Sequence, residues 1–111
     1  MIDLKGSDSM SAVLDILPSE VKRRLDAGEE MQIIDVRELD EVQQGMIPGA
    51  RHIALGELPS RFGEIDGQRE VIFVCRSGGR SGRACELASS QGLGKIHNMV
   101  GGMLAWDGDL A

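Results

Sequence analysis

The sequence predicts a single α/β domain in which a mostly parallel sheet carries helices on both faces. Two observations support this fold class. Short apolar runs alternate with helix-like segments along the whole chain, which is the pattern of βαβ units. The chain also has 111 residues, 41% hydrophobic and 27% charged, which is the size and composition of one ordinary globular domain.

The first predicted elements are a strand and a helix. Residues 1–11 are polar and contain glycine and serine, so we expect them to be loosely ordered and residues 12–111 to form the domain. The apolar run over residues 13–17 has the length of a short strand. Pro18-Ser19 favours a helix start with the serine as N-cap, and Gly28 favours the end of that helix.

The middle of the chain predicts two more strands and two more helices. An apolar run predicts the first of these strands, and the acidic segment after it predicts a short helix that Gly45 ends. A Pro-Gly turn then separates this helix from the next short strand. The expected ranges are a strand over 31–36, a helix over 38–44, a turn over 47–50, a strand over 51–54, a helix over 56–65 and a turn at Asp66-Gly67.

The last third of the chain predicts a buried strand and a helix, followed by one more such pair. Residues 71–74 are apolar and mostly β-branched, which is typical of a fully buried parallel strand. The spacing of apolar residues predicts a helix over 81–91, and residues 95–99 and 102–107 predict a last strand and a last helix. Ligands of such folds bind beyond the carboxyl ends of the strands, which is where Cys75 lies.

The segment that joins the 71–74 strand to the following helix is the strongest functional signal in the chain. Its two adjacent glycines let the backbone curl. Curled backbone at a helix N-terminus directs several N–H groups inward and forms an anion-binding cup, to which two arginines add positive charge. A thiol in such a cup has a lowered pKa and is largely thiolate near neutral pH. We therefore predict Cys75 as the catalytic nucleophile and Arg76, Ser77, Gly78, Gly79, Arg80 and Ser81 as substrate-binding residues.

The alternative interpretation of Cys75 is a buried packing residue, since cysteine is often buried. A packing cysteine does not need two arginines and two glycines directly after it, so we favour the reactive thiol. Cys85 lies within the helix beside small apolar residues, and we expect it to pack. A disulfide between the two is not expected, because the mostly helical chain between them holds their Cα atoms beyond the ~7 Å bridging limit. A metal site is not expected either, because there is no Cys-x-x-Cys pair and His52 and His97 lack ligand-like spacing.

The overall charge and composition narrow the class of partner. The net charge of −6 and the scarcity of aromatic residues argue against nucleic-acid binding. We expect no signal peptide and no membrane association, because no apolar run follows a basic start or approaches spanning length. Two cysteines without an export signal indicate a reducing, cytoplasmic setting. The positive charge beside Cys75 is therefore local, which favours a dedicated anion site.

A cysteine phosphatase or an arsenate reductase is the sharpest chemical alternative. Such an enzyme also attacks through a thiolate that is held in a cup of N–H groups and closed by arginine. Tyrosine-phosphatase loops have the pattern Cys-x5-Arg, whereas Arg80 follows Cys75 in the pattern Cys-x4-Arg. A loop shorter by one residue forms a smaller cup, which would crowd a tetrahedral phosphate but hold one extra sulfur atom.

The chain resembles the rhodanese (thiosulfate sulfurtransferase-like) family in its small single-domain form. The resemblance covers about residues 12–107 and rests on four segments that occur in the family's order. These segments are Ile34-Asp35-Val36-Arg37-Glu38, Gly45-Met46-Ile47-Pro48-Gly49-Ala50-Arg51-His52-Ile53, the loop Cys75 to Ser81, and Asn98-Met99-Val100-Gly101-Gly102-Met103-Leu104-Ala105-Trp106.

The resemblance implies a five-stranded parallel sheet and a persulfide on Cys75. The implied donor is a small sulfur anion, thiosulfate or a persulfide, and the implied acceptor is cyanide or a thiol, including that of a redox protein such as thioredoxin. Neither a metal nor an organic cofactor is implied. The alternative within this family is a non-turnover sulfur carrier or a partner-binding domain. The intact cysteine and loop arginine favour turnover.

Asp35 and Arg37 are possible supporting residues, because they lie at a strand end near the expected site. We favour a structural role for this pair, since charged residues at such turns often cap and pair. A thiolate that is already formed needs no general base, so we expect His52 and His97 to be hydrogen-bonding residues. Trp106 is expected to pack rather than to bind ligand.

Glu41 is a departure from the family pattern. Two-domain relatives of this kind carry a basic residue at this position, where it helps to bind thiosulfate. The acid puts efficient use of thiosulfate in doubt, although Arg76 and Arg80 are placed to compensate from within the loop. The acidic face formed by Glu38, Asp40 and Glu41 is otherwise expected to be solvated helix surface.

Overall fold

A computed structural model describes residues 13–111, so the expectations for residues 1–11 and for the start of the domain at residue 12 lie outside the described residues. Five strands form one sheet in the order β1-β5-β4-β2-β3, and every neighbouring pair is parallel. The strands are β1 (Val13–Ile16), β2 (Gln32–Asp35), β3 (Arg51–His52), β4 (Val71–Val74) and β5 (Ile96–Met99). The predicted parallel α/β sheet is confirmed, with β4 as its central strand.

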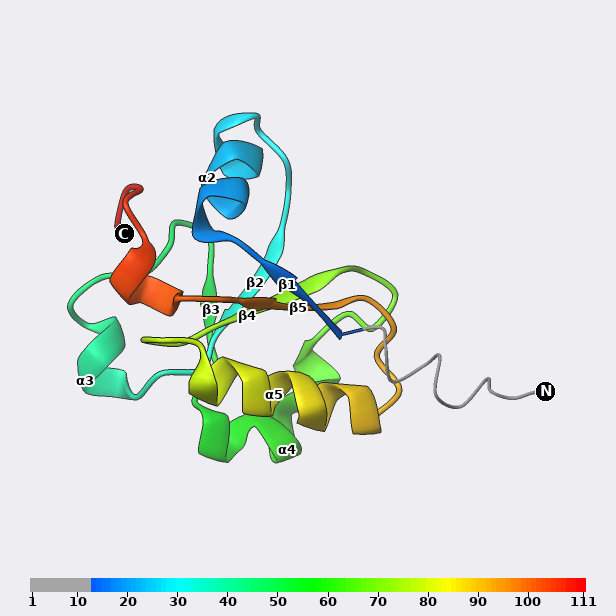
Figure 1. Ribbon diagram of the computed structural model, residues 1–111. Coiled ribbons are helices and arrows are strands. Elements are labelled where there is room, and N and C mark those ends of the chain that lie inside the picture. Colours follow the sequence, from blue (N-terminus) through cyan, green and yellow to red (C-terminus); the bar gives the residue numbers. More distant parts are fainter. Residues whose placement is uncertain (1–12) are drawn as a thin grey trace.

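Helices cover both faces of this sheet (Figure 1). On one face lie α2 (Pro18–Asp26) and the 3₁₀ turn η3 (Gly102–Ala105), which contact each other. On the other face lie α4 (Leu58–Arg61) and α5 (Gly79–Ser90), and α5 packs against β4 and β5. The short helix α3 (Leu39–Val42) lies on the side of the molecule where β5 runs into η3.

The alternation of side chains along β4 divides the core into two layers. Phe73 belongs to the cluster that includes Ala84, Cys85 and Ala88 of α5. Ile72 and Val74 belong to the cluster on the other face, with residues of β1, α2 and β5. All four residues of β4 are fully buried, as expected for a parallel strand covered on both faces.

The ends of α2 differ in part from the prediction. Leu17, not Ser19, is the N-cap residue; it is extended and gives no side-chain cap. The reason is Pro18, whose fixed φ suits the first helical position and moves the start of the helix one residue earlier. Gly28 follows the C-cap with φ +83°, and the N–H groups of Gly28 and Glu29 bond to the carbonyls of Leu25 and Arg24. This is a Schellman ending, so the predicted role of Gly28 is confirmed.

Three predicted helices are shorter or tighter than expected. The helix predicted over 38–44 is the one-turn α3, Leu39–Val42. The segment predicted as one helix over 56–65 consists of η1 (Leu55–Glu57), α4 and η2 (Phe62–Glu64), because glycines and a proline interrupt it. The segment predicted as a helix over 102–107 is the short 3₁₀ turn η3. In addition, α5 begins at Gly79 rather than at Ser81, so the end of the Cys75 loop is the first helical turn.

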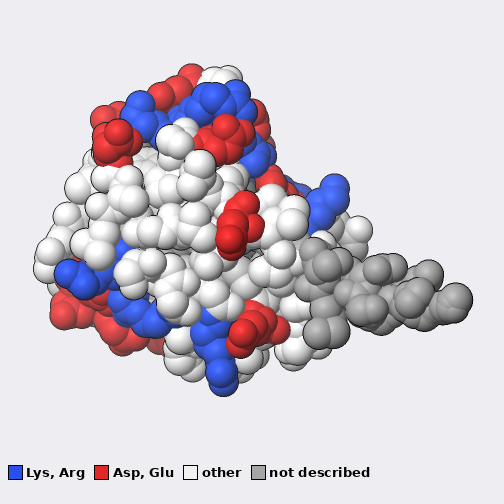
Figure 2. Space-filling view, in the orientation of Figure 1, with Lys and Arg blue, Asp and Glu red and all other residues white. Residues whose placement is uncertain are grey.

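The surface carries charges of both signs close together. Figure 2 shows Lys and Arg interleaved with Asp and Glu over α2, where Lys22 pairs with Asp26 and Arg23 with Glu20. Such exposed pairs contribute little to stability, about 0–1 kcal/mol each. Among residues 13–111, the helices are all too short or too polar to cross a membrane.

The close approach of η3 to the Cys75 loop gives a first prediction. Gly102 has φ +58°, and a Cβ there would overlap the carbonyl groups of Arg76 and Cys75. We expect Gly102→Ala to lower the free energy of unfolding by about 3 kcal/mol in urea denaturation, through backbone strain plus overlap. Gly28→Ala is the matched control, because Gly28 also has positive φ but has no atom within 4 Å of the added Cβ. It should cost only about 1–2 kcal/mol; an equal loss at both positions would contradict the close approach.

Candidate active site

Cys75 follows directly after β4 and lies at the base of the loop that leads into α5. The N–H of Gly78 donates to Cys75 Sγ at 3.0 Å, and Ser81 Oγ lies 3.3 Å from the same sulfur. Gly78 is the N-cap of α5 and has φ +108°, which glycine adopts without strain. The loop therefore curls around the sulfur, and the Cys75 residue is only 1% exposed.

The surroundings of the thiol favour its ionised form. Burial raises the pKa of Cys75, but hydrogen bonds from the Ser81 hydroxyl and from the N–H groups of Ser81, Gly78 and Ser77 outweigh burial and lower it. The other thiol has no such donors: Cys85 is fully buried on α5, and burial raises its pKa to about 12. Both thiols are free. The lowered pKa of Cys75 is therefore local to the loop.

Asn98 holds the loop from the neighbouring strand β5. Ser81 Oγ donates to Asn98 Oδ1 at 2.6 Å, and Asn98 Nδ2 donates to the Gly78 carbonyl at 3.2 Å. Because a thiolate can only accept, the Ser81 hydroxyl can turn from Asn98 to Cys75 Sγ when the thiol ionises. The sequence indicated no separate role for Asn98. Its only signal was a polar residue within a predicted strand, and the structure places that residue beside Phe73 of the central strand.

Arg80 is paired outside the loop. Its two terminal nitrogens donate to the two carboxylate oxygens of Glu41 on α3 at 2.7 and 2.8 Å. Glu41 also accepts from the Glu38 N–H and so completes the capping box of α3. The expectation that Glu41 is only solvated surface is therefore wrong. The expectation that Arg80 compensates for the acid is also corrected, because Arg80 is neutralised by it.

The Arg80 pair also has a pH dependence. The hydrogen bonds from Arg80 and from the Glu38 N–H lower the pKa of Glu41 from 4.5 to about 2. A depressed carboxylate pKa means that the pair stabilises the folded chain above pH 4.5, and that this contribution is lost as the pH falls toward 2. Glu41 is therefore ionised at any physiological pH.

Asp35 and Arg37 form a buried ion pair at the end of β2. Arg37 Nη2 and Nε donate to the Asp35 carboxylate at 2.7 to 3.0 Å, and Arg37 Nη2 also donates to the Gly45 carbonyl at 2.8 Å. The ring nitrogen Nε2 of His52 lies 2.7 Å from the Arg37 carbonyl, as a hydrogen-bonding histidine should. His97 contacts Glu70 at 2.7 Å through Nε2, while its buried Nδ1 has no partner among the described residues.

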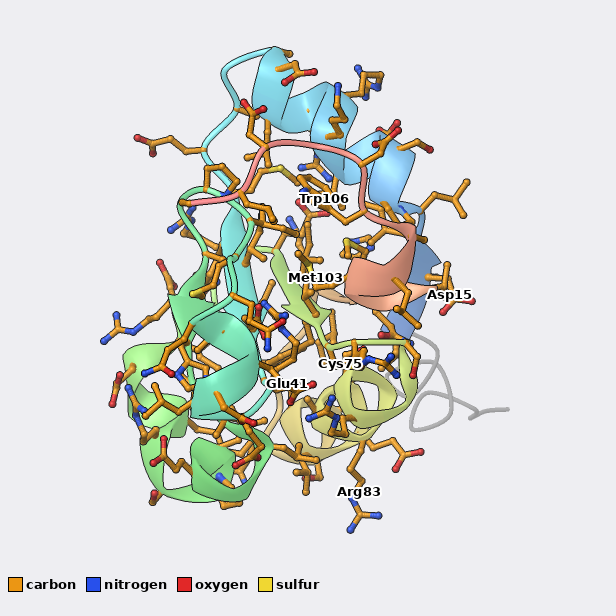
Figure 3. All side chains as sticks on the ribbon, turned by 90° about the vertical axis from the view of Figure 1, so that its left-hand side faces the viewer. Asp15, Glu41, Cys75, Arg83, Met103 and Trp106 are labelled. Atoms are coloured by element: carbon orange, nitrogen blue, oxygen red, sulfur yellow. The ribbon has the colours of Figure 1, made fainter. Side chains whose placement is uncertain are left out.

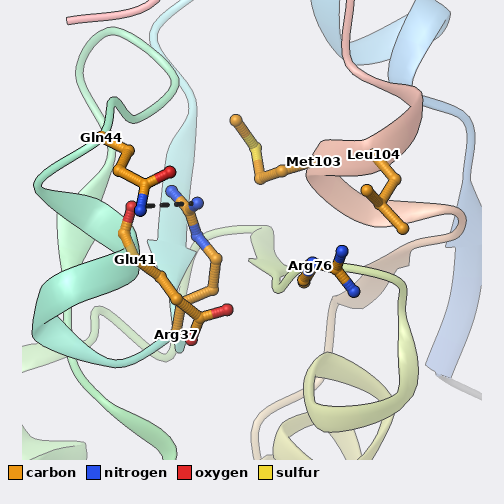
Figure 4. Close-up of a pocket in the computed structure, with 6 residues that line it drawn as sticks. All are labelled: Arg37, Glu41, Gln44, Arg76, Met103 and Leu104. Carbon is orange, nitrogen blue, oxygen red and sulfur yellow. Dashed lines mark hydrogen bonds between the residues drawn. The ribbon is translucent and has the colours of Figure 1, made fainter.

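A pocket of about 240 Å³ opens beside the loop (Figure 4). On one side lie Glu41, Gln44 and Arg37, whose Nη1 donates to the Glu41 carbonyl. On the other side lie Arg76, Met103 and Leu104. The N–H groups of η3 fix that side, because Met103 donates to the Cys75 carbonyl and Leu104 to the Arg76 carbonyl.

The candidate residues thus occupy different positions around the sulfur. Gly78 and Ser81 contact it, Ser77 contributes its N–H, and Arg76 and Gly79 are exposed. Figure 3, which views this side directly, shows Cys75 below Met103 and to the right of Glu41, with Arg83 pointing away. Within residues 13–111 there is no group of three or more His, Cys, Asp or Glu side chains that could hold a metal ion.

The Ser81 hydroxyl gives a test of the cup. The wild-type rate of Cys75 alkylation against pH should have its midpoint below the ordinary cysteine value of about 8.5. In Ser81→Ala the loss of the hydroxyl donor should move that midpoint to higher pH and slow alkylation at neutral pH by several fold. Ser77→Ala is the control, because it keeps the N–H that acts on the sulfur. An unchanged midpoint in Ser81→Ala would mean that the hydroxyl does not act on the thiol.

Comparison with known proteins adds an independent line of information. A family model described as "Rhodanese-like domain" matches residues 17–109. The putative sulfurtransferase YtwF of Bacillus subtilis is 42% identical, over 87% of this chain and 93% of its own length. A sulfurtransferase of Allochromatium vinosum is 38% identical, over 85% and 88%. The putative sulfur carrier protein YrkF of Bacillus subtilis is 37% identical over 93% of this chain, which spans 56% of that relative. The crystal structure of a rhodanese-like domain protein from Staphylococcus aureus superposes with a TM-score of 0.82 at 32% identity, over 87% and 95%.

Proposed function

Because this chain belongs to the rhodanese-like domain family, we propose that it is a sulfurtransferase that carries sulfane sulfur as a persulfide on Cys75. The observation that carries the proposal is the convergence of the Gly78 N–H and the Ser81 hydroxyl on Cys75 Sγ. This arrangement lowers the pKa of the thiol and offers the same donors to the terminal sulfur of a persulfide.

The proposed reaction has two steps. In the first, the Cys75 thiolate attacks the outer sulfur of an anionic donor, and the bond between that sulfur and the rest of the donor breaks. The leaving group, sulfite from thiosulfate or a thiolate from a persulfide, departs with the bonding electron pair. In the second, cyanide or a thiol attacks the outer sulfur of the Cys75 persulfide, and the Cys75 thiolate is regenerated. No electrons are gained or lost overall, and covalent catalysis of this kind is ping-pong.

The burial of Cys75 supports transfer of a single atom over attack on a phosphate or arsenate. With the residue 1% exposed, there is little room around the sulfur for an incoming group. A terminal sulfur is one atom wide, whereas a tetrahedral oxyanion needs several donors around its oxygens. Arg80, the loop arginine that would serve such an oxyanion, is held by both oxygens of Glu41.

A second candidate is a carrier that accepts sulfur and hands it to a partner without turning over small acceptors. The relative YrkF, named a putative sulfur carrier protein, favours considering it. In either role, we propose that a thiol, including that of a redox protein such as thioredoxin, receives the sulfur. The proposed setting is the reducing cytoplasm, because both cysteines are free.

Steady-state kinetics test the proposal. We expect thiosulfate or an organic persulfide, with cyanide or a small thiol as acceptor, to give parallel double-reciprocal lines. Intersecting lines would contradict a persulfide intermediate. Sulfur uptake without turnover would identify the carrier. Cys75-dependent hydrolysis of an aryl phosphate would support the phosphatase alternative and overturn the proposal.

A further inference from the structure

A short segment after η3 ties that turn to the end of α3. This segment, Asp107 to Ala111, is termed the strap, and Figure 3 shows it in pale red, crossing from η3 to the loop that follows α3. The Ala111 N–H donates to the Met46 carbonyl at 2.8 Å, and the Met46 N–H donates back to the Ala111 carbonyl at 3.2 Å. Trp106 Nε1 donates to the Asp109 carbonyl at 3.0 Å and so fixes the middle of the strap.

The strap also contacts the end of α3 through the side chain of Leu110. A Cβ added at Gly45, whose φ is +131°, would lie only 2.9 Å from Leu110 Cδ1, so this leucine rests on the Gly45 backbone. The Gly45 carbonyl in turn accepts a hydrogen bond from Arg37 Nη2 at 2.8 Å. Arg37 is paired with the buried Asp35. The turn that ends α3 is therefore held between the strap and a buried ion pair.

The short helix α3 needs such support, because it has little packing of its own. It is a single turn, Leu39–Val42, and of its residues only Val42 is buried. A helix this short is not stable in water by itself, so the contacts at its ends decide where it lies. Those contacts are two hydrogen bonds from the Arg37 side chain to backbone carbonyls, and the strap.

The position of α3 affects the Cys75 loop because this helix carries Glu41. Both carboxylate oxygens of Glu41 accept from Arg80, at 2.7 and 2.8 Å, and this pair joins α3 to the first turn of α5. The hydrogen bonds to Glu41 raise the pKa of Arg80 against the effect of burial, and the charges of Glu41 and of the Cys75 thiolate raise it further. The Arg80 cation therefore interacts with the thiolate, and Glu41 offsets the positive charge that Arg80 offers to it.

We propose that the strap regulates the charge of the anion-binding cup. Bound to the end of α3, it holds Glu41 against Arg80; released, it lets Glu41 move away and leaves Arg80 unpaired beside Cys75. Leu110 and Ala111 are thus positioning residues, which act through α3 and do not contact the sulfur. This inference rests on the proposed persulfide function of Cys75. It goes further by naming a segment outside the loop that sets the electrostatics of the nucleophile.

Two alkylating reagents of similar size test this inference, because iodoacetate is an anion and iodoacetamide is neutral. The ratio of their rates at Cys75, followed by the mass of the modified peptide, reports the positive charge at the cup. A change in general access to the thiol would affect both reagents alike. The double variant Leu110→Ala/Ala111→Pro removes the side chain that rests on Gly45 and the N–H that bonds to Met46. We expect it to raise the iodoacetate-to-iodoacetamide ratio at neutral pH by about threefold or more.

The dependence on Glu41 separates positioning from a general loosening of the fold. Glu41→Gln should raise the ratio by a similar factor while the strap is intact, since it frees Arg80 directly. In the Glu41→Gln background, the strap variant should have no further effect. Leu14→Ala is the matched control, because Leu14 is a leucine of similar exposure, 55% against 57% for Leu110, that lies on β1 and outside the strap. It should leave the ratio unchanged.

Several results would contradict the regulation by the strap. A ratio that rises in Glu41→Gln but not in the strap variant would overturn this inference alone, because Glu41 would then keep its place without the strap. An equal further rise when the two changes are combined would also overturn it, because the strap would then act by another route. If the double variant does not fold in thermal unfolding, Leu110→Ala alone gives the same test with a smaller expected rise. Failure of both thiosulfate and an organic persulfide to place sulfur on Cys75 would instead overturn the proposed function.

Discussion

Replacing Cys75 with alanine is expected to abolish sulfur transfer, with turnover falling by at least about a thousandfold. The reason is that Cys75 is the only thiol among the described residues whose pKa is lowered. Burial raises the pKa of the other thiol, Cys85, to about 12. The measurement is the rate of sulfur transfer from benzenethiosulfonate to a thiol acceptor at neutral pH.

Cys85→Ala is the matched control for this substitution. Both cysteines are buried and both changes remove one sulfur atom from the same apolar cluster, so their effects on packing should be similar. Cys85→Ala should keep nearly the wild-type rate once its stability has been checked by thermal unfolding. A Cys75→Ala variant that retained activity would show that the nucleophile lies elsewhere.

The largest expected effect on stability comes from the buried ion pair at the end of β2. Asp35 is 1% exposed, and its carboxylate accepts three hydrogen bonds from the Arg37 side chain and one from the Arg37 N–H. We expect Asp35→Ala to lower the free energy of unfolding by about 3–5 kcal/mol, because it leaves the Arg37 guanidinium buried without its counter-charge. Urea denaturation measures this loss.

Asp26→Ala provides the comparison for Asp35→Ala. It breaks the pair with Lys22, in which the aspartate side chain is 68% exposed, and should cost less than about 1 kcal/mol. Similar losses for the two variants would mean that burial does not distinguish the pairs. Because Arg37 also lines the pocket, Asp35→Ala should alter donor use as well as stability.

Much of this architecture follows from short-range patterns. The run Val71 to Val74 has no polar residue, so a central parallel strand is the simplest arrangement that buries it on both sides. A cysteine directly after such a strand, followed by two glycines, is thereby placed at the carboxyl edge of the sheet. The same logic predicts the α5 helix, although its start at Gly79 depends on the turn geometry of Gly78.

The parts that do not follow from the sequence are contacts between distant segments. The pairing of Arg80 with Glu41 joins residues 39 apart and requires α3 to lie beside the start of α5. The role of Asn98 depends on β5 lying next to β4, which fixes the asparagine against Ser81 and Gly78. The helix and strand propensities of short segments do not show that α3 lies beside α5 or that β5 lies next to β4. Both contacts change the chemistry of the site, since one removes a cation from the pocket and the other orients a donor to the thiol.

These contacts also bear on the choice of donor. The loop contains two arginines, Arg76 and Arg80, and with both unpaired it would be suited to a dianion. Of these two arginines, only Arg76 has no carboxylate partner among residues 13–111, because both carboxylate oxygens of Glu41 hold Arg80. The positive charge that the loop offers to an anion therefore depends on Glu41, a residue outside the loop.

The most direct test of the central claim is the intact mass of the protein after incubation with benzenethiosulfonate or thiosulfate and removal of the donor. The wild type and Cys85→Ala should each gain the mass of one sulfur atom, and Cys75→Ala should gain none. Addition of cyanide or a thiol should return the mass to its starting value. No gain in the wild type with either donor, or the same gain in Cys75→Ala, would contradict a persulfide on Cys75.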